Sequence, residues 1–473
     1  MRRLAIAFWA FIALAGTAPG SAAAQPAAAD WPMAAFDLAH TGNNPAETSL
    51  GVANAAQLHP VWSVSVDGSA ITTQAILAAG VPTATASRDL LIVSTEHGTT
   101  AALDAVTGAT VWSVNTGYVH TTCGDLPNGD FGITSAAAFD RLSGAVYAMG
   151  GDGKLYAYAV ATGAVLPGWP VSILGNPSVE HVYGAVTVAN GSVYVATGGL
   201  CDVGVYYGRI VQVTVAPTPA VANRLYVGGT VADASGNIVT PGYAGGGVWG
   251  AAGVTVDSAG SVYAATGNLL HAPNENMLYG NHILKMLPNL SVTGATTPQQ
   301  NPCGGCDNDF GSTPVLFQPA TCRPRLAVLN KRHYVYVYRP TPFTNYPFQY
   351  IHENNFVGEV AYEPGSQTLI SANLNGVRAY HYDTTCQASA TWVVGGNSGP
   401  GGQLGQAVSP PTIANGVVYY ANGAGSSING FNLATGQRVL GRRLSGYSFA
   451  APTVVNGALF QPTWDGKVTA FRP

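Results

Sequence analysis

Hydrophobic and polar residues alternate along most of this chain in short runs that Gly and Asp residues separate. Residues 143–163 read SGAVYAMGGDGKLYAYAVATG. In this segment an apolar run, Ala145–Ala148, precedes a Gly-Asp-Gly turn at Gly151–Gly153, and an alternating run, Lys154–Ala159, precedes Thr162–Gly163. Alternation is typical of half-buried strands, and Gly and Asp supply the positive φ angles of tight turns. The segment is therefore predicted to form a β-hairpin.

The same pattern recurs along the chain, which predicts a repeat architecture. Full copies stand at 90–108, 415–436 and 456–471, half-copies at 190–199 and 259–268, and looser copies at 325–338 and 365–382. Units of roughly 40–65 residues are long enough for four strands, and all-β repeats of that length are typical of propellers. The fold class is therefore predicted to be all-β, with four-stranded antiparallel blades.

The number of blades follows from the strand that opens each unit, which is rich in small residues. Such strands begin near Ile133, Gly184, Gly250, Ser312, Ala407 and Ala450, and less clearly near Thr72 and Val357. This indicates an eight-bladed β-propeller. The last hairpin lacks an outer strand, and the N-terminal segment Pro60–Val66 is predicted to supply it, because closing the ring removes exposed strand edges.

The N-terminus reads as a secretory signal peptide. Arg2 and Arg3 precede an apolar run that ends near Leu14, and the small residues Ser21–Ala24 offer a cleavage site. The run is too short to cross a bilayer, and no transmembrane segment is predicted later in the chain. The expected organisation is a signal peptide at 1–24, a lead-in segment at 25–45 and one propeller domain at 46–473. We therefore expect an exported protein, either periplasmic or secreted.

The composition argues against one class of partner and leaves the cysteines free to form disulfides. Charged residues make up 9% of the chain and form no basic stripe, so nucleic acid is not an expected partner. Six cysteines in an exported chain permit disulfides. Cys303 and Cys306 could pair locally, and Cys322 and Cys386 are candidates to lie on adjacent blades, but sequence alone does not give the pairing. Asp307, not His, follows Cys306, so no covalent haem site is expected.

Three further segments carry a family resemblance. They read GGGVWGAAGVTVDSAGSVYAATGN at 245–268, CDNDFGSTPVL at 306–316 and VLNKRHYVYVY at 328–338. Together they resemble the quinoprotein alcohol dehydrogenases, eight-bladed propellers that hold pyrroloquinoline quinone (PQQ) on the central axis. WPMAAFDLAHTGNNP at 31–45 also resembles the segment that opens such chains. The polyvinyl-alcohol dehydrogenase branch, without its haem domain, is the most similar in pattern.

The resemblance implies a set of site residues. Trp249 would stack under the quinone, Lys331 would contact its oxygens, and Asp307 would be the general base on an alcohol. Asn268, Asp307 and Asp309 would be ligands of a hard cation such as Ca²⁺, which prefers oxygen donors and polarises a carbonyl. Each residue also has a structural reading: an inter-blade Trp, a turn-forming Asn, carboxylates that cap a turn, and a solvated Lys.

The chain also departs from the family pattern. It has no adjacent cysteine pair beside the expected quinone, and only Cys123 lies in the comparable blade. The arginine expected downstream in that blade is absent. Cys201 and Asp202 stand where the family has a metal-ligand glutamate, and Asp202 is a shorter substitute.

Three functions remain open on the sequence alone. The first is an exported PQQ- and Ca²⁺-dependent dehydrogenase that oxidises an alcohol or polymeric alcohol and passes electrons to a separate acceptor such as a cytochrome. The second is a cofactor-free propeller that serves as a binding or assembly scaffold in the cell envelope. The third is another propeller enzyme, a hydrolase or lyase at the mouth of the ring. A fold does not decide among these functions.

Overall fold

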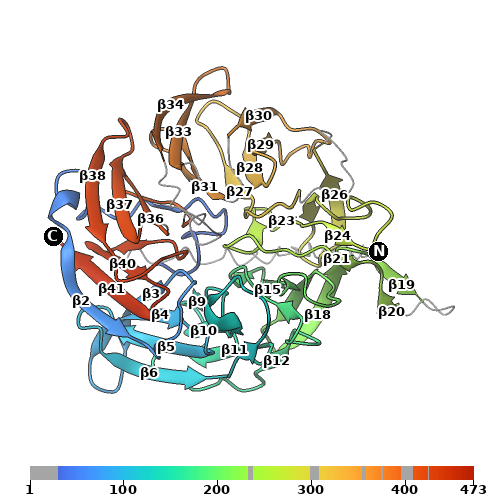
Figure 1. Cartoon of the computed structure of the whole chain (residues 1–473), viewed down its shortest axis with the longest axis horizontal. Helices are drawn as coiled ribbons and strands as arrows, with labels where there is room; N and C mark the ends of the chain where they lie inside the picture. The colour runs from blue at the N-terminus through green and yellow to red at the C-terminus, as the bar shows by residue number, and fades with distance from the viewer. Residues whose placement is uncertain are drawn as a thin grey trace, which may run out of the picture.

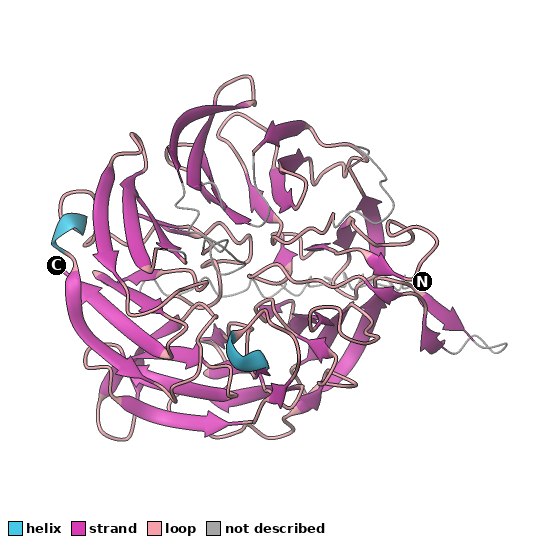
Figure 2. Cartoon of the chain, in the orientation of Figure 1, coloured by secondary structure: helices cyan, strands magenta, loops and turns pink. Residues whose placement is uncertain are grey.

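The computed structural model forms a ring of eight four-stranded antiparallel blades around one axis (Figure 1). It describes residues 30–232, 238–298, 308–353, 358–373, 376–395, 409–423 and 425–473. Within these ranges the chain contains no α-helix, only two short 3₁₀ turns at Ala55–Gln57 and Pro127–Gly129 (Figure 2). The predicted fold class and blade number are confirmed.

The blades follow one another in chain order. From inner to outer strand, the first four are β3–β6 (Ile76–Pro82, Ser87–Ser94, Thr99–Asp104, Thr110–Asn115), β9–β12 (Ala138–Asp140, Ala145–Met149, Lys154–Ala159, Val171–Ser172), β14, β15, β17 and β18 (Thr187–Ala189, Ser192–Ala196, Arg209–Thr214, Ala220–Tyr226), and β22, β23, β25 and β26 (Thr255–Val256, Val262–Ala265, Ile283–Met286, Val292–Thr296). The next four are β27–β30 (Val315–Phe317, Arg325–Asn330, Tyr334–Tyr338, Gln349–His352), β31–β34 (Gly358–Glu363, Thr368–Asn373, Gly376–Tyr382, Ala388–Gly395), β35–β38 (Thr412–Ala414, Val417–Asn422, Ser427–Asn432, Arg438–Arg443), and β39–β41 (Thr453–Val455, Ala458–Pro462, Lys467–Arg472) with β2 (His59–Ser65).

Four two-stranded ribbons lie in the loops between blades and in loops inside the third and fourth blades. They are β7 with β8 (Val119–His120, Asp130–Phe131), β13 with β16 (Glu180–His181, Gly198–Gly199), β19 with β20 (Thr230–Ala232, Ile238–Pro241) and β21 with β24 (Ala244–Gly245, Leu269–Leu270). The β19–β20 ribbon projects outward from the ring (Figure 1).

The ring is closed by the N-terminal strand β2, as the sequence predicts. β2 pairs antiparallel with β41, from His59 opposite Arg472 to Ser65 opposite Lys467. Figure 1 shows the first and last strands of the propeller side by side in blue and red. The eighth blade therefore takes three strands from the C-terminus and one from the N-terminus, so β41 is paired on both sides.

An N-terminal strap, residues 30–44, runs along the inner strands from blade to blade. Its backbone and side chains bond to seven blades in turn, through Trp31 with Leu77, Pro32 with Phe139, Leu38 with Val256, Ala39 with Leu316, Thr41 with Tyr362, Gly42 with Ile413 and Asn44 with Val454. At the third blade it packs through Met33 and Leu38. Asn43 and Asn44 form β1, which pairs in parallel with β35. The strap thus ties all eight blades together from inside the ring.

Outer strands are joined to the following blade by tryptophan rings that lie on glycines. Gly163 has φ +70°, and a Cβ built on it would lie 2.7 Å from Cε3 of Trp112. The Trp112 indole N–H donates to the carbonyl of Val160 at 2.7 Å. Trp62 with Gly108 and Trp392 with Gly436 repeat this arrangement. The Thr-Gly turns of the repeat therefore need glycine both for the positive φ and for the close contact.

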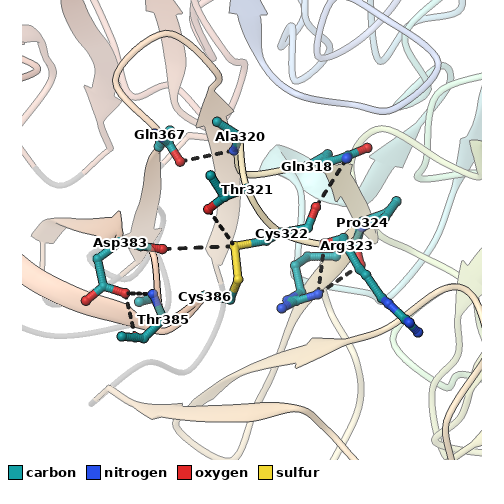
Figure 3. Close-up of a disulfide and its surroundings, with 12 residues drawn as sticks. Gln318, Ala320, Thr321, Cys322, Arg323, Pro324, Gln367, Asp383, Thr385 and Cys386 are labelled. Carbon is teal, nitrogen blue, oxygen red and sulfur yellow. Dashed lines mark hydrogen bonds between the residues drawn. A yellow bond between two sulfur atoms is a disulfide. The ribbon is translucent and has the colours of Figure 1, made fainter.

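A disulfide joins the fifth and sixth blades. Cys322, in the loop after β27, pairs with Cys386, in the loop after β33, with Cα atoms 5.7 Å apart (Figure 3). The expectation that these two cysteines lie on adjacent blades is confirmed. Cys303 and Cys306 lie outside the described residues, as does the predicted signal peptide. No helix in the described part of the chain is both long and apolar enough to span a bilayer.

Candidate functional site: an axial cavity

A cavity of about 430 Å³ lies on the axis of the ring. Its wall takes residues from the strap and from all eight blades, and many of them stand in the loops before inner strands. The volume falls in the range of small-molecule sites, which are about 300–1,000 Å³. Small residues on the inner strands leave this space open, because bulky side chains there would meet across the axis.

Trp249 forms a flat part of the cavity wall beside Gly311. Trp249 follows Gly245–Gly247, and both Gly245 and Gly246 have positive φ angles. A Cβ built on Gly311 would lie 2.2 Å from Cη2 of Trp249, so only glycine permits the ring to lie this close to the backbone. Trp249 and Gly311 both line the cavity. The sequence placed Trp249 in the site, and the structure brings it to the cavity wall.

Asp309 connects the other predicted residues to this wall. Its Oδ1 accepts the backbone N–H of Asn268 at 2.6 Å, and its Oδ2 lies 3.4 Å from Nζ of Lys331. The Lys331 ammonium also lies 5.0 Å from the centroid of the Trp249 ring. Asp309 and Lys331 both line the cavity. Trp249, Asp309 and Lys331 therefore form one connected group on the wall. Asn268 joins this group through its backbone N–H and is not among the described residues that line the cavity. Asp307, the predicted general base, lies outside the described residues.

Asp202 also lines the cavity, beside a disulfide that the sequence did not reveal. Cys123, in the loop between β7 and β8, pairs with Cys201, which directly precedes Asp202. The bridge joins the second and third blades beside the cavity and places Asp125 and Asp202 on its wall. Burial raises the pKa of Asp125, the charge of Lys331 lowers it, and the charge of Asp202 raises it, so Asp125 lies within the field of both groups.

Aromatic side chains make up much of the remaining wall. Tyr183, Tyr206, Phe449 and Trp464 line the cavity with Trp249. Burial, followed by the charge of Asp202 and a hydrogen bond to it, raises the pKa of Tyr206, so this phenol stays neutral at physiological pH. The sequence analysis did not single these residues out, because alternating tyrosines and tryptophans are common in blade cores and nothing in their spacing separates a wall residue from a core residue.

The wall suits a planar aromatic ligand together with a cation. The half-buried ring of Trp249 offers a flat surface for stacking, and the glycines around it leave room for close approach. Among the described residues that line the cavity, Lys331 is the single Lys or Arg side chain. Four side chains there carry carboxyl groups: Asp125, Asp202, Asp309 and Glu359. A polyanionic quinone such as PQQ therefore fits this wall only with a metal ion, for which Asp202 and Asp309 provide the oxygen donors that hard cations prefer.

Comparison with known proteins agrees with the architecture. Residues 47–264 match the PQQ_2 family, described as outer membrane protein assembly factor BamB. No curated protein sequence matches the chain. Quinohemoprotein alcohol dehydrogenase from Comamonas testosteroni is similar in structure, with a TM-score of 0.69 and 16% identity over 93% of this chain and 80% of that one.

Two more solved structures share the fold. A europium-containing methanol dehydrogenase has a TM-score of 0.67 and 14% identity over 94% of this chain and 98% of that one. BamB from Moraxella catarrhalis has a TM-score of 0.55 and 14% identity, with 88% and 98% covered. At these identities the likeness establishes the fold alone. The chain is therefore an eight-bladed β-propeller, and in fold it is similar to the quinohemoprotein alcohol dehydrogenase and to the methanol dehydrogenase.

Proposed function

We propose that the protein is an exported quinoprotein dehydrogenase that oxidises an alcohol with PQQ and a hard cation such as Ca²⁺ in the axial cavity. The observation that carries the proposal is the convergence of Trp249, Asp309 and Lys331 on one cavity wall. These residues come from two blades, and Trp249 and Lys331 are 82 positions apart in the sequence. Two disulfides suit an oxidising compartment, which supports export.

Each residue has a defined task in this proposal. Trp249 binds the flat face of the cofactor and fixes its plane. Lys331, whose Nζ lies 3.4 Å from Oδ2 of Asp309, presents a positive charge to the quinone oxygens. The quinone supplies a two-electron acceptor and the cation supplies Lewis-acid polarisation. Asp307 remains the proposed acceptor of the hydroxyl proton, and a separate protein, such as a cytochrome, is the proposed electron acceptor.

The test is reconstitution of the purified protein with PQQ and Ca²⁺, followed by a dye-linked oxidation assay on short alcohols and polyvinyl alcohol. We expect dye reduction that requires both additions. Trp249→Ala should weaken PQQ binding, Asp307→Asn should abolish turnover with PQQ binding retained, and Trp392→Phe, far out on β34, should change neither. Failure of PQQ to bind would refute the proposal.

A scaffold function is the second candidate, and the BamB family match over residues 47–264 favours it. In this alternative the protein binds a partner in the cell envelope and needs no cofactor. Under that function PQQ would not bind, and Trp249→Ala would leave the protein's binding to envelope partners unchanged.

A further inference from the structure

Glu359 is a buried carboxyl group of the cavity wall that the proposed mechanism does not use. It stands near the start of β31, the inner strand of the sixth blade, and is 7% exposed. It lines the same cavity as Trp249 and Lys331. A buried carboxyl group has to be hydrogen-bonded to be tolerated, so its partners show what the group does for the structure.

The partners of Glu359 are the two segments that build the Trp249 wall. Oε1 accepts the backbone N–H of Ala251 at 3.1 Å and that of Thr313 at 3.0 Å, and Oε2 accepts the Thr313 N–H at 3.1 Å. Ala251 follows Trp249 by two residues, and Thr313 follows Gly311 by two residues. One side chain of the sixth blade therefore holds the fourth and fifth blades together directly behind the contact of Trp249 with Gly311.

These two segments are too closely packed for another acceptor to replace the carboxyl group. A Cβ built on Gly250 would lie 2.5 Å from the backbone nitrogen of Thr313. The Thr313 hydroxyl accepts the N–H of Ala252 at 2.9 Å, which adds a second link between the segments. Without Glu359, the N–H groups of Ala251 and Thr313 would lose their acceptor. The loss is costly at Thr313, which is buried, and it removes the link between the two segments.

The protonation state of Glu359 changes the charge of the cavity. Burial raises the pKa of this carboxyl group to about 8, although the N–H groups of Thr313 and Ala251 and the Thr313 hydroxyl act to lower it. The other titratable groups on the cavity wall are His40 of the strap, Asp309 and Lys331 of the fifth blade, Asp125 and Asp202 beyond the disulfide, and Tyr183 and Tyr206 of the third blade. Glu359 is thus neutral at physiological pH and adds a negative charge in alkaline solution.

We propose that Glu359 is the positioning residue that holds Trp249 against Gly311, and that its proton controls the affinity of the cavity for a planar anionic ligand. The second part rests on the proposed function, in which that ligand is PQQ. The first part does not, because the clamp exists without any ligand. Loss of the proton leaves the N–H acceptors in place but sets a buried negative charge beside an anion, which weakens binding of the anion.

The clamp is tested without ligand by the indole ¹⁵N–¹H resonance of Trp249, assigned with Trp249→Phe. In the wild type we expect this signal to titrate with a midpoint near pH 8. Glu359→Gln keeps an acceptor oxygen but cannot ionise, so it should hold the signal near its neutral-pH position at every pH. Glu359→Ala should displace the signal at every pH. The matched control is Glu96→Gln, which removes a different buried carboxyl group and should leave the titration intact.

The ligand part is tested by titrating the same proteins with PQQ in the presence of Ca²⁺. Wild-type affinity should fall about tenfold between about pH 7 and pH 9, and Glu359→Gln should bind with near wild-type affinity at neutral pH and without that dependence. The proposal is overturned if Glu359→Ala leaves the Trp249 resonance in place, or if Glu359→Gln keeps the wild-type pH dependence of the resonance or of binding. Absence of PQQ binding to the wild type at every pH would refute the proposed function and the ligand part, while the resonance still decides the clamp.

Discussion

Replacement of Glu96 by Gln should make the protein more stable in neutral and alkaline solution. Glu96 follows β4, is 1% exposed, and accepts the Thr72 hydroxyl at 2.6 Å and the Gly132 N–H at 3.3 Å. Burial raises its pKa to about 8, the bonds from Thr72 and Gly132 lower it, and the charge of Asp67 raises it further. Gln has the same shape and can serve both partners with its amide, but it never carries a charge.

The magnitude follows from proton linkage. In the unfolded chain this carboxyl group ionises near its ordinary pKa of 4.5, whereas in the folded protein it keeps its proton to about pH 8. Its contribution to stability is therefore fully present below about pH 4.5 and is lost as the pH rises to about 8. Across about three pH units the unfolded state binds up to one proton fewer than the folded state. Integrated over this range, the difference lowers the free energy of unfolding of the wild type by about 3 kcal/mol.

The assay is urea unfolding of the wild type and of Glu96→Gln at pH 5 and pH 8. The free energy of unfolding of the variant, relative to the wild type, should be about 3 kcal/mol higher at pH 8 than at pH 5. Glu180→Gln is the control of opposite sign. Burial acts to raise the pKa of Glu180, but the hydrogen bonds and charge of Arg209 and the N–H groups of Gly175 and Asn176 together lower it, so this variant should lose stability at pH 8. Equal differences at both pH values for Glu96→Gln would refute the reasoning.

Two further predictions concern the joints between blades. Gly163→Ala should lower the free energy of unfolding by about 3 kcal/mol, because the new methyl group meets Trp112 and the residue keeps a positive φ. Gly144→Ala is the control, with φ +64° and open space around it, and should lower the free energy of unfolding by about 1 kcal/mol. Equal losses for the two variants in urea unfolding would contradict the packing argument. Removing the disulfide with Cys322→Ser and Cys386→Ser should lower stability by about 4 kcal/mol, because the bridge spans 64 residues, and a reducing agent should then have no further effect at that site.

The fold could be predicted from the sequence because every blade carries the same local signals for strands and turns. The turn glycines and the alternation in segments such as Ser143–Gly163 fix hairpins locally, and the small-residue strands mark where each blade begins. The missing outer strand of the last hairpin was enough to identify β2 as the closing strand. The path of the strap could not be predicted, because it depends on backbone hydrogen bonds to six blades and on a side-chain hydrogen bond from Asn44 to the eighth, and no alternation in residues 30–44 indicates these partners.

The site was readable only where the sequence departs from the repeat. Trp249, Asp309 and Lys331 stand in segments that resemble a known family, and all three line the axial cavity, while their roles toward a quinone and a cation stay predictions. Glu359 follows no motif and reads as one polar residue at the start of a buried strand, because its role comes from two segments of other blades. The Cys123–Cys201 pairing was hidden for the same reason, since it depends on how the second and third blades meet.

The central claim is that the axial cavity binds a quinone on Trp249 with a cation beside it. A crystal structure of the protein soaked with PQQ and Ca²⁺ tests this claim most directly. The account predicts density for the quinone stacked on Trp249, with Lys331 near its oxygens and the cation bound by carboxylates of the cavity wall. A cavity free of quinone at saturating PQQ and Ca²⁺, or a quinone bound away from Trp249, would contradict the account.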